Sequence, residues 1–248
     1  MNVSTFASAD DVALEVAKVI LDSAFAAIAE RGRFHLVLSG GRTPEAAYHH
    51  LSVMATERKV DWSKVEIYWG DERMVPRDSP DSNFAMAQRS WLSQVSLPTE
   101  NIHGYDTGLP AASDTAADFS KSLKAQSGLP VNDGYPVFDL ILLGLGDDGH
   151  TASLFPGHIE ALESTKLVVG TTPGTLPPPV DRVTFTFPVL NHARLVLFIV
   201  AGESKATAVK HIFEDAPAIV DAPASGVRGN VRWLLDNAAV SRLSVIPV

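Results

Sequence analysis

Short apolar segments that run directly into glycine-containing loops recur along this chain, and they restrict its fold more than any other feature. The four clearest segments are Phe34–Leu38, Val65–Trp69, Asp139–Leu143 and Arg194–Val200. Each has the length and the nearly continuous apolar character of a strand that is buried on both faces. Strands of this kind that alternate with helices predict an α/β fold, in which a mostly parallel sheet has helices on both faces.

Helical patterns lie between these strands. Apolar residues recur at helical spacing in Asp10–Glu30, and the helix after the fourth strand is expected to end near Phe213. Pro44 suits the first position of a helix that follows the first glycine loop. The alanine-rich segment Ala111–Gln126 predicts a surface helix. We find no repeat and only one short proline-rich loop, Thr171–Pro179, so residues 1–248 are expected to form a single domain.

The charge balance limits what the protein can bind. The chain has 20 Lys and Arg residues against 29 Asp and Glu residues, a formal net charge of -9. No basic field is therefore present to attract a nucleic acid or an anionic membrane. No apolar run approaches the roughly 20 residues that a membrane-spanning helix needs. The first residues lack the pattern of a secretory signal, and we expect a cytoplasmic protein.

Two cations are predicted to lie at helix starts. Arg42 follows the first glycine loop, and Lys205 follows the loop after the fourth strand. The positive end of a helix dipole disfavours a cation and favours an anion. Taken singly, each has an ordinary explanation, because tight turns use glycine for steric reasons and most lysines are solvated. Together, at strand ends on one edge of the sheet, they predict a shared site for a phosphate monoester.

The segment Gly144–Pro156 carries the strongest local signal. Its glycines allow the backbone to approach a ligand closely, and His150 is suited to proton transfer near neutral pH. Either Asp147 or Asp148 would orient the imidazole ring. The same three side chains are a legitimate metal-ligand set. No second cluster of ligands stands nearby in the sequence, so a metal site is not expected.

Asp71, Glu72 and Arg73 directly follow the second strand. As residue types they are typical of a surface ion-pair cluster, and the downstream Ser82 and Asn83 are typical of a helix cap. Their position at the carboxyl end of a strand favours another interpretation. We expect at least one of these side chains to project into the crevice that holds His150.

Taken together, these motifs resemble the 6-phosphogluconolactonases of the pentose phosphate pathway. The matching pieces are Leu38–Pro44, Trp69–Arg73 with Ser82–Phe84, Gly144–Pro156, Arg182–Phe185 and Gly202–Ala206. They follow the family's order over most of the chain, and the run Asp-Gly-His-Thr-Ala-Ser-Leu-Phe-Pro that ends at Pro156 is highly specific. The resemblance implies a Rossmann-like sheet, shared with glucosamine-6-phosphate deaminases and ribose-5-phosphate isomerases, and no cofactor.

The resemblance also implies an activity. We expect hydrolysis of 6-phospho-D-glucono-1,5-lactone to 6-phosphogluconate, in which His150 activates water and Asp71 and Asp148 complete the catalytic set. The residues expected to contact the sugar or its phosphate are Ser39, Gly40, Gly41, Arg42, Thr43, Arg73, Asn83, Gly146, Arg182 and Lys205. The partner is a small phosphosugar lactone, with no nucleic acid, membrane or metal. The chain is expected to be a monomer or a weak homo-oligomer.

Two other functions deserve comparison. A glucosamine-6-phosphate deaminase or sugar-phosphate isomerase resembles the chain at the first glycine loop, the Asp-Gly-His and the Lys205 region. In the deaminases an Ile-Ala-Phe-Asn-Glu-Pro type of run follows the histidine, whereas residues 151–156 here lack that glutamate. A non-catalytic sugar-phosphate sensor is the second alternative. Such regulators carry a DNA-binding segment, and this acidic chain has no basic segment of that kind at either end.

Overall fold

A parallel sheet forms the centre of the molecule, for which the computed structural model describes residues 2–173 and 178–245. Within these residues a seven-stranded sheet has the order β1-β12-β11-β8-β2-β3-β5, and every neighbouring pair is parallel. The strands are β1 (Asn2–Phe6), β2 (Phe34–Leu38), β3 (Val65–Trp69), β5 (Ile102–His103), β8 (Leu140–Leu143), β11 (Val196–Val200) and β12 (Val231–Asp236). The predicted α/β fold with a mostly parallel sheet is confirmed.

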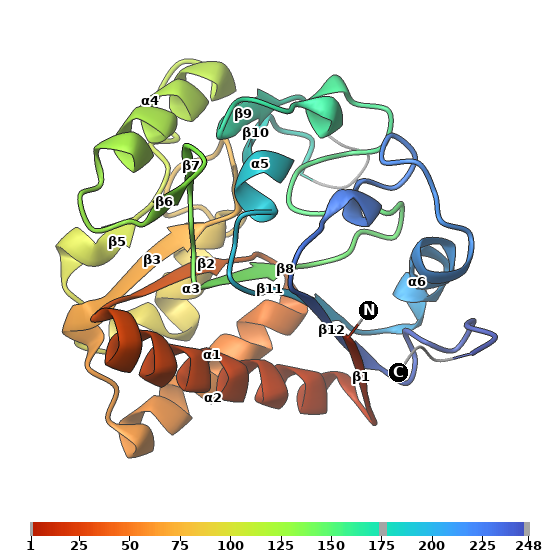
Figure 1. Ribbon diagram of the computed structural model, residues 1–248, viewed down its shortest axis with the longest axis horizontal. Coiled ribbons are helices and arrows are strands. Elements are labelled where there is room, and N and C mark those ends of the chain that lie inside the picture. The colour runs from red at the N-terminus through yellow and green to blue at the C-terminus, as the bar shows by residue number, and fades with distance from the viewer. Residues whose placement is uncertain (1, 174–177, 246–248) are drawn as a thin grey trace.

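Helices cover both faces of this sheet. On one side α1 (Ala9–Arg31) packs along α2 (Arg42–Arg58), and α3 (Asn83–Ser90) contacts α2. Figure 1 shows α4 (Ala112–Ala125) and α5 (Phe187–Leu190) on the opposite side of the sheet, with α6 (Ala206–Glu214) at the end where β12 lies. No helix in the described part of the chain is long and apolar enough to cross a membrane.

A second, smaller sheet packs above the first one. Its antiparallel strands are β4 (Asp71–Arg73), β10 (Arg182–Phe185) and β9 (Val168–Thr171). The two sheets are joined at Gly70, whose carbonyl accepts a hydrogen bond from Phe185 N at 2.8 Å. Helix α4 lies so close to β9 that a Cβ atom on Gly170 would stand 2.6 Å from the Ala112 carbonyl carbon. A short hairpin, β6 (Val131–Asn132) with β7 (Tyr135–Pro136), completes this side of the molecule.

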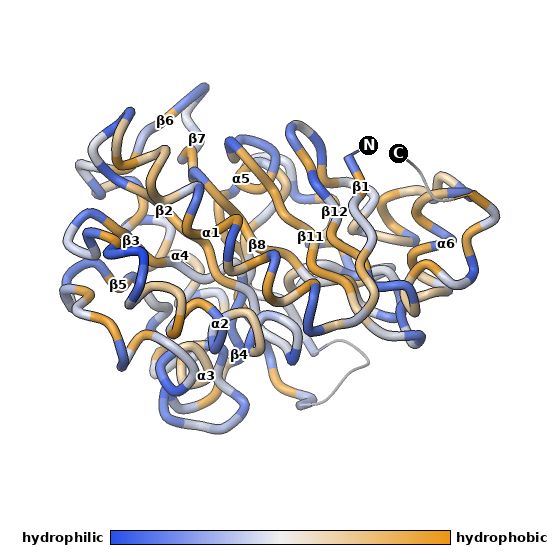
Figure 2. Tube along the Cα trace, turned by 90° about the horizontal axis from the view of Figure 1, so that it is seen from below, coloured by the Kyte–Doolittle hydropathy of each residue, from blue (hydrophilic) through white to orange (hydrophobic). Residues whose placement is uncertain are grey.

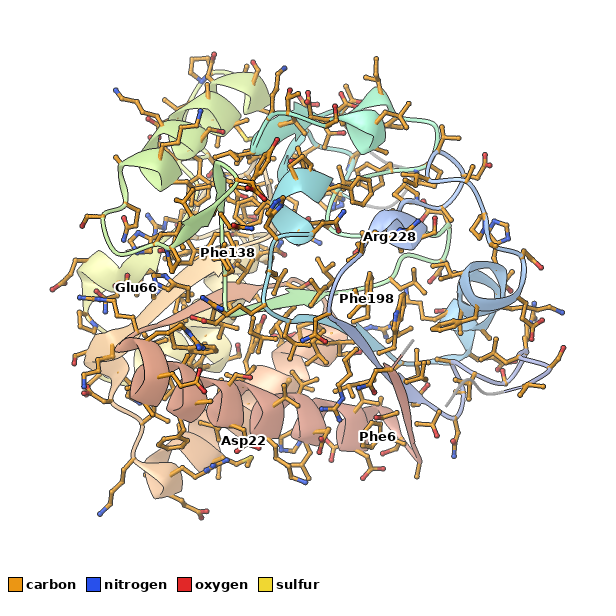
Figure 3. The ribbon with its side chains drawn as sticks, viewed as in Figure 1. Phe6, Asp22, Glu66, Phe138, Phe198 and Arg228 are labelled. Carbon is orange, nitrogen blue, oxygen red and sulfur yellow. The ribbon has the colours of Figure 1, made fainter. Side chains whose placement is uncertain are left out.

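The core lies between these layers. Figure 2 shows hydrophobic residues along β8 and β11 and hydrophilic ones at the tip of the β6-β7 hairpin. Phe138, labelled in Figure 3, connects the two sheets, since its ring centroid lies 5.0 Å from that of Tyr68 and 5.4 Å from that of Phe185. Phe198 stacks on Trp233 at 3.8 Å. The aromatic packing fixes the strands from whose ends the functional loops leave.

The predicted elements agree with the structure to within about two residues at each end, with one correction. Pro44 is the third residue of α2 and not the first, because the helix begins at Arg42. Proline is accepted there because the first N–H groups of a helix have no intrahelical partner. The strands β1, β12 and the whole small sheet were not predicted. In the proline-rich segment Thr171–Pro179, Thr171 belongs to β9, and residues 174–177 lie outside the described residues.

Candidate active site

The carboxyl ends of four neighbouring strands surround one cavity. The strands are β11, β8, β2 and β3. The strand order changes direction between β2 and β8, because β3 and β5 were added on one side of β2 and β8, β11 and β12 on the other. Ligands of open α/β sheets bind at such a reversal. The cavity has a volume of about 320 Å³. It is lined by Ser39, Gly40, Gly41, Arg42, Thr43, Pro44, Asp71, Arg73, Asn83, Gly144, Leu145, Gly146, His150, Ala152, Arg182, Ile199, Val200, Ala201 and Lys205.

The first glycine loop forms one wall, and its geometry requires glycine. A Cβ atom on Gly40 would lie 2.0 Å from Asn83 Oδ1. Gly41 has φ 107°, a left-handed conformation that side chains disfavour. The loop leads into Arg42 at the first position of α2, whose start has no side-chain hydrogen bond. The open N–H groups and the exposed Arg42 therefore face the cavity together.

The Asp-Glu-Arg motif forms strand β4, and its side chains lie on two different sides of that strand. Side chains alternate along a strand, so Asp71 and Arg73 point into the cavity while Glu72 points away from it. Asp71 is buried and accepts a hydrogen bond from Ser153 Oγ at 2.7 Å. Arg73 Nη1 donates to the Asp81 carbonyl at 2.7 Å. The expectation that at least one of the three side chains enters the crevice is confirmed.

Glu72 holds the start of α3. Its buried carboxylate accepts hydrogen bonds from the backbone N–H groups of Arg73, Asn83 and Phe84, each at 2.8 Å. Ser82 Oγ donates to it at 3.0 Å. Burial raises the pKa of Glu72, and the three backbone donors oppose that rise. The carboxylate thus fixes Asn83, whose Nδ2 donates to the Asp71 carbonyl at 2.9 Å.

The loop after β8 places His150 against Gly146. A Cβ atom on Gly146 would lie 2.0 Å from His150 Nδ1, so only glycine leaves room for the ring. Gly146 N donates to the His150 carbonyl at 2.8 Å, and Gly149 has φ 88°. The ring also contacts Phe155, with 4.9 Å between centroids. Gly146 and Phe155 therefore both limit the position of the ring in the cavity wall.

Asp148 is the carboxylate that contacts this imidazole. Its Oδ1 lies 2.6 Å from His150 Nδ1 and accepts from His150 N at 3.0 Å. Burial acts to raise the pKa of Asp148, but hydrogen bonding to His150 and the ring's charge outweigh it and lower the pKa to about 2. Because an ionised carboxylate only accepts hydrogen bonds, Nδ1 carries the proton. In a neutral ring, Nε2 then keeps its lone pair, as a general base requires.

The remaining two cations come from different elements. Arg182 on β10 is buried, and its Cζ lies 5.5 Å from the Phe155 centroid. Burial lowers the pKa of Arg182, and the charge of Asp71 opposes that change. Lys205 is the N-cap residue of α6, and its Nζ lies 2.5 Å from Asp147 Oδ1. As at α2, the cap of α6 makes no side-chain hydrogen bond.

Twelve of the thirteen predicted site residues line this cavity, and the thirteenth, Asp148, contacts His150 directly. Two residues that support the site were not predicted: Ser153, which donates to Asp71, and Tyr48, whose hydroxyl donates to the Ser39 carbonyl at 2.8 Å. Ser153 lies in the Gly144–Pro156 motif, and its place in that motif could have identified it as a site residue. Among the described residues, no group of three or more His, Cys, Asp or Glu side chains is arranged to hold a metal ion.

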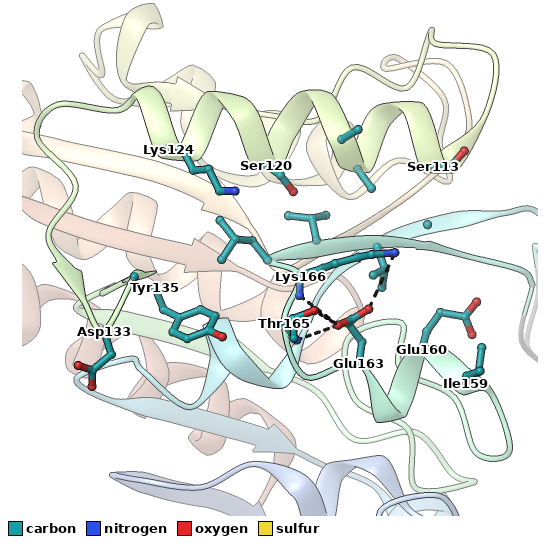
Figure 4. A pocket seen from close by; sticks show the side chains of 17 residues that line it. Ser113, Ser120, Lys124, Asp133, Tyr135, Ile159, Glu160, Glu163, Thr165 and Lys166 are labelled. Atoms are coloured by element: carbon teal, nitrogen blue, oxygen red, sulfur yellow. Dashed lines mark hydrogen bonds and ion pairs between the residues drawn. The ribbon is translucent and has the colours of Figure 1, made fainter.

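A larger cavity, of about 810 Å³, lies elsewhere, between α4 and the segment that leads into β9. Figure 4 shows its side chains, among which Glu163 is the centre of a local network. Glu163 Oε1 accepts hydrogen bonds from Thr165 N and Thr165 Oγ1, both at 2.8 Å. Among the described residues that line this cavity there is no histidine. The smaller cavity is therefore the candidate active site.

The chain resembles known proteins over almost its whole length. The family described as glucosamine-6-phosphate isomerases/6-phosphogluconolactonase matches residues 7–235. The chain is 40% identical over 233 residues to the 6-phosphogluconolactonase of Nostoc sp., an alignment that covers 92% of each protein. The structure of 6-phosphogluconolactonase from Trypanosoma brucei superposes with a TM-score of 0.84 at 31% identity, covering 98% of each chain. A monomeric glucosamine-6-phosphate deaminase gives 0.82 at 19% identity, covering 97% of this chain and 99% of that one, which shows a shared fold alone.

Proposed function

The chain belongs to the family of glucosamine-6-phosphate isomerases and 6-phosphogluconolactonases, and from that premise we propose that it is a 6-phosphogluconolactonase. It hydrolyses 6-phospho-D-glucono-1,5-lactone to 6-phosphogluconate, a step of the pentose phosphate pathway. One observation carries the proposal. The His150–Asp148 pair opens onto a cavity in which the starts of α2 and α6 and their cations converge.

In the proposed reaction His150 is the general base. Nε2 takes a proton from a water molecule whose oxygen bonds to the lactone carbonyl carbon. The carbonyl oxygen gains negative charge, which Arg73 or the N–H groups of the glycine loops stabilise. The bond to the ring oxygen then breaks, and that oxygen receives the proton from the imidazolium. Asp148 keeps the ring oriented and supports its positive charge during the step.

The phosphate of the substrate is assigned to the starts of α2 and α6, neither of which has a side-chain cap. N–H groups in the first turn of a helix bind phosphate well, and Arg42, Lys205 and Arg182 add positive charge. Ser39, Gly40, Gly41 and Thr43 at α2, with Gly146, form the wall along which the ligand lies. Asp71 and Asn83 are proposed to face the sugar, since both are fixed by the protein, by Ser153 and Glu72 respectively.

The deaminase alternative is disfavoured by the residues after the histidine. Thr151 donates to the Gly144 carbonyl at 2.9 Å, Ser153 donates to Asp71, and Phe155 packs against the ring of His150. These contacts use the segment to build the loop. No glutamate occupies residues 151–156 to serve as the further acid that a deaminase uses. Because lactonases and deaminases share the fold, the residues of this segment are what favour the lactonase activity over the deaminase activity.

Three broader expectations belong to the same proposal. We infer that residues 1–248 form one domain, because β1 from one end of the chain pairs with β12 near the other. The cytoplasmic location and the monomeric or weakly oligomeric state stay predictions from the sequence.

The activity is tested by adding freshly prepared phosphorylated lactone and following acid release above the enzyme-free rate. We expect kcat/KM to be at least roughly 10- to 150-fold higher than with the unphosphorylated gluconolactone, because even one hydrogen bond to a charged phosphate contributes about 1.5 to 3 kcal/mol. A parallel assay with glucosamine 6-phosphate should release no ammonia. Equal rates on the two lactones, or ammonia release, would contradict the proposed function.

A further inference from the structure

Asp147 is an acid beside the catalytic pair for which the mechanism above has no use. Its Oδ1 lies 2.5 Å from Lys205 Nζ, and Ser204 Oγ donates to the same oxygen at 3.3 Å. Lys205 is among the residues that line the active-site cavity, and Asp147 is not. The lysine assigned to the phosphate is therefore already paired with a carboxylate of the protein.

We propose that Asp147 is a built-in counter-ion that competes with the substrate phosphate for Lys205 and so keeps phosphate binding weak. The proposal rests on the proposed function, because it takes Lys205 as a phosphate ligand. Asp147 and Asp148 are adjacent in one loop, yet they contact different side chains, Lys205 and His150 respectively. Asp148 supports the chemistry at His150, and Asp147 sets how tightly the other end of the substrate is held.

Competition follows from the charges involved. A phosphate monoester brings a charge of about -1.5 to -2 to an amine that is already paired. Either the phosphate displaces Asp147, which loses the existing pair, or Lys205 contacts both anions, which brings like charges together. Both outcomes oppose binding. Displacement is feasible because the Asp147 side chain is 48% exposed and water can solvate the released carboxylate.

Weak phosphate binding suits this reaction. Hydrolysis turns an uncharged ring ester into a carboxylate, so the product carries one more negative charge than the substrate. Both keep the same phosphate, and a strong hold on that group would retain the product as well. By weakening the hold at Lys205, Asp147 favours release of 6-phosphogluconate.

The test compares dissociation constants for inorganic phosphate and for 6-phosphogluconate, measured by titration calorimetry at one fixed ionic strength. The proteins are the native chain, Asp147→Asn, Lys205→Met and the double variant. Asp147→Asn should bind both ligands about 3- to 10-fold more tightly, since a part-exposed pair alone contributes roughly 1.5- to 5-fold and the repulsion adds to it. Lys205→Met should bind both more weakly. In the double variant the gain from Asp147→Asn should fall below about 2-fold.

Asp215→Asn is the matched control, because it removes the same charge at the far end of α6, where Asp215 pairs with His211 at 2.9 Å. It should change both dissociation constants by less than about 2-fold. If Asp147→Asn leaves phosphate binding unchanged or weakens it, while Lys205→Met weakens it, the counter-ion proposal is wrong and the phosphate site stands. If Lys205→Met has no effect, the proposed function itself loses its phosphate ligand. Should Asp147→Asn fail to fold, Asp147→Ser takes its place in the same measurement.

Discussion

Of the helices that begin beside the active-site cavity, α3 and α2 differ most in how the N–H groups of the first turn are bonded. At α3 the buried carboxylate of Glu72 accepts hydrogen bonds from the N–H groups of Asn83 and Phe84, and Ser82 caps the same turn. At α2 the cap residue is Gly41, which has no side chain to accept a hydrogen bond from the first turn. One start is completed by the protein, and the other is left open to the cavity.

The difference indicates that the start of α3 contributes to the stability of the fold, whereas the start of α2 contributes to ligand binding. The first N–H groups of any helix need an acceptor, and a carboxylate is a strong one. At α3 that acceptor is a residue of the chain, so the turn is rigid without a ligand. At α2 we assign the acceptor to the substrate phosphate. The closed start also shapes the open one, because Asn83 lies directly against Gly40.

The largest effect is expected from Glu72→Ala. It leaves three backbone N–H groups and the Ser82 hydroxyl without their buried acceptor. A buried donor that loses its acceptor costs about 1 to 3 kcal/mol, so a total of about 3 to 5 kcal/mol should appear in the free energy of unfolding measured with urea. Glu57→Ala, an exposed change on α2, should stay within about 0.5 kcal/mol. If Glu72→Ala lowers the free energy of unfolding by less than about 1 kcal/mol, the start of α3 is not stabilised by Glu72 as described.

Arg42→Met should give the reverse result at the open start. Arg42 is exposed and, in the part of the chain that the structure describes, forms no ion pair, so the free energy of unfolding should change by less than about 0.5 kcal/mol. Its kcat/KM on the phosphorylated lactone should fall roughly 10- to 150-fold, since a hydrogen bond to a charged group is lost. The measurement pairs urea unfolding with steady-state kinetics. A large loss of stability with unchanged kinetics would reverse the assignment of the two starts.

Asp148 tests whether a carboxylate used in catalysis also stabilises the fold. Its pKa is lowered to about 2 in the folded protein, below the value of about 3.9 for an unfolded chain. A depressed pKa contributes stability that is fully present above the unfolded value and lost as the pH falls towards about 2. After a discount for the 31% exposure of the side chain, the contribution is about 1 to 2 kcal/mol.

The stability difference between the native protein and Asp148→Asn should therefore shrink as the pH falls from about 5 to about 2. Urea unfolding at several pH values across this window measures it. A difference that stays constant over the window would show that the ionised Asp148 adds nothing to the fold.

The sequence predicted the strands that carry the site because they are continuous apolar runs that end in glycine. It could not predict that β1 pairs with β12, since Asn2–Phe6 is a short, partly polar segment whose partner lies more than 220 residues away in the chain. The separate roles of Asp71, Glu72 and Arg73 were equally hidden. They depend on the pairing of β4 with β10, which decides which side chains alternate into the cavity.

The neighbouring acids in the histidine loop show the same limit. The sequence left open whether Asp147 or Asp148 orients His150. The structure answers through backbone geometry, because the turn at Gly149 folds the chain so that the His150 N–H and ring both reach Asp148. Asp147 is left to Lys205, whose position depends on a helix that starts more than 50 residues later.

The most direct test of the account is His150→Asn. If His150 is the general base, kcat should fall about 100- to 10,000-fold, after subtraction of the enzyme-free rate, while the dissociation constant for 6-phosphogluconate changes by less than about 2-fold. The native enzyme should lose kcat/KM towards acid pH, because an imidazole base works only when neutral and Asp148, with a pKa of about 2, stays ionised in that range. The variant should lose this pH dependence. Activity within a few-fold of native, with the same decline at acid pH, would contradict the account and transfer the role of base to another residue, with Asp71 as the next candidate.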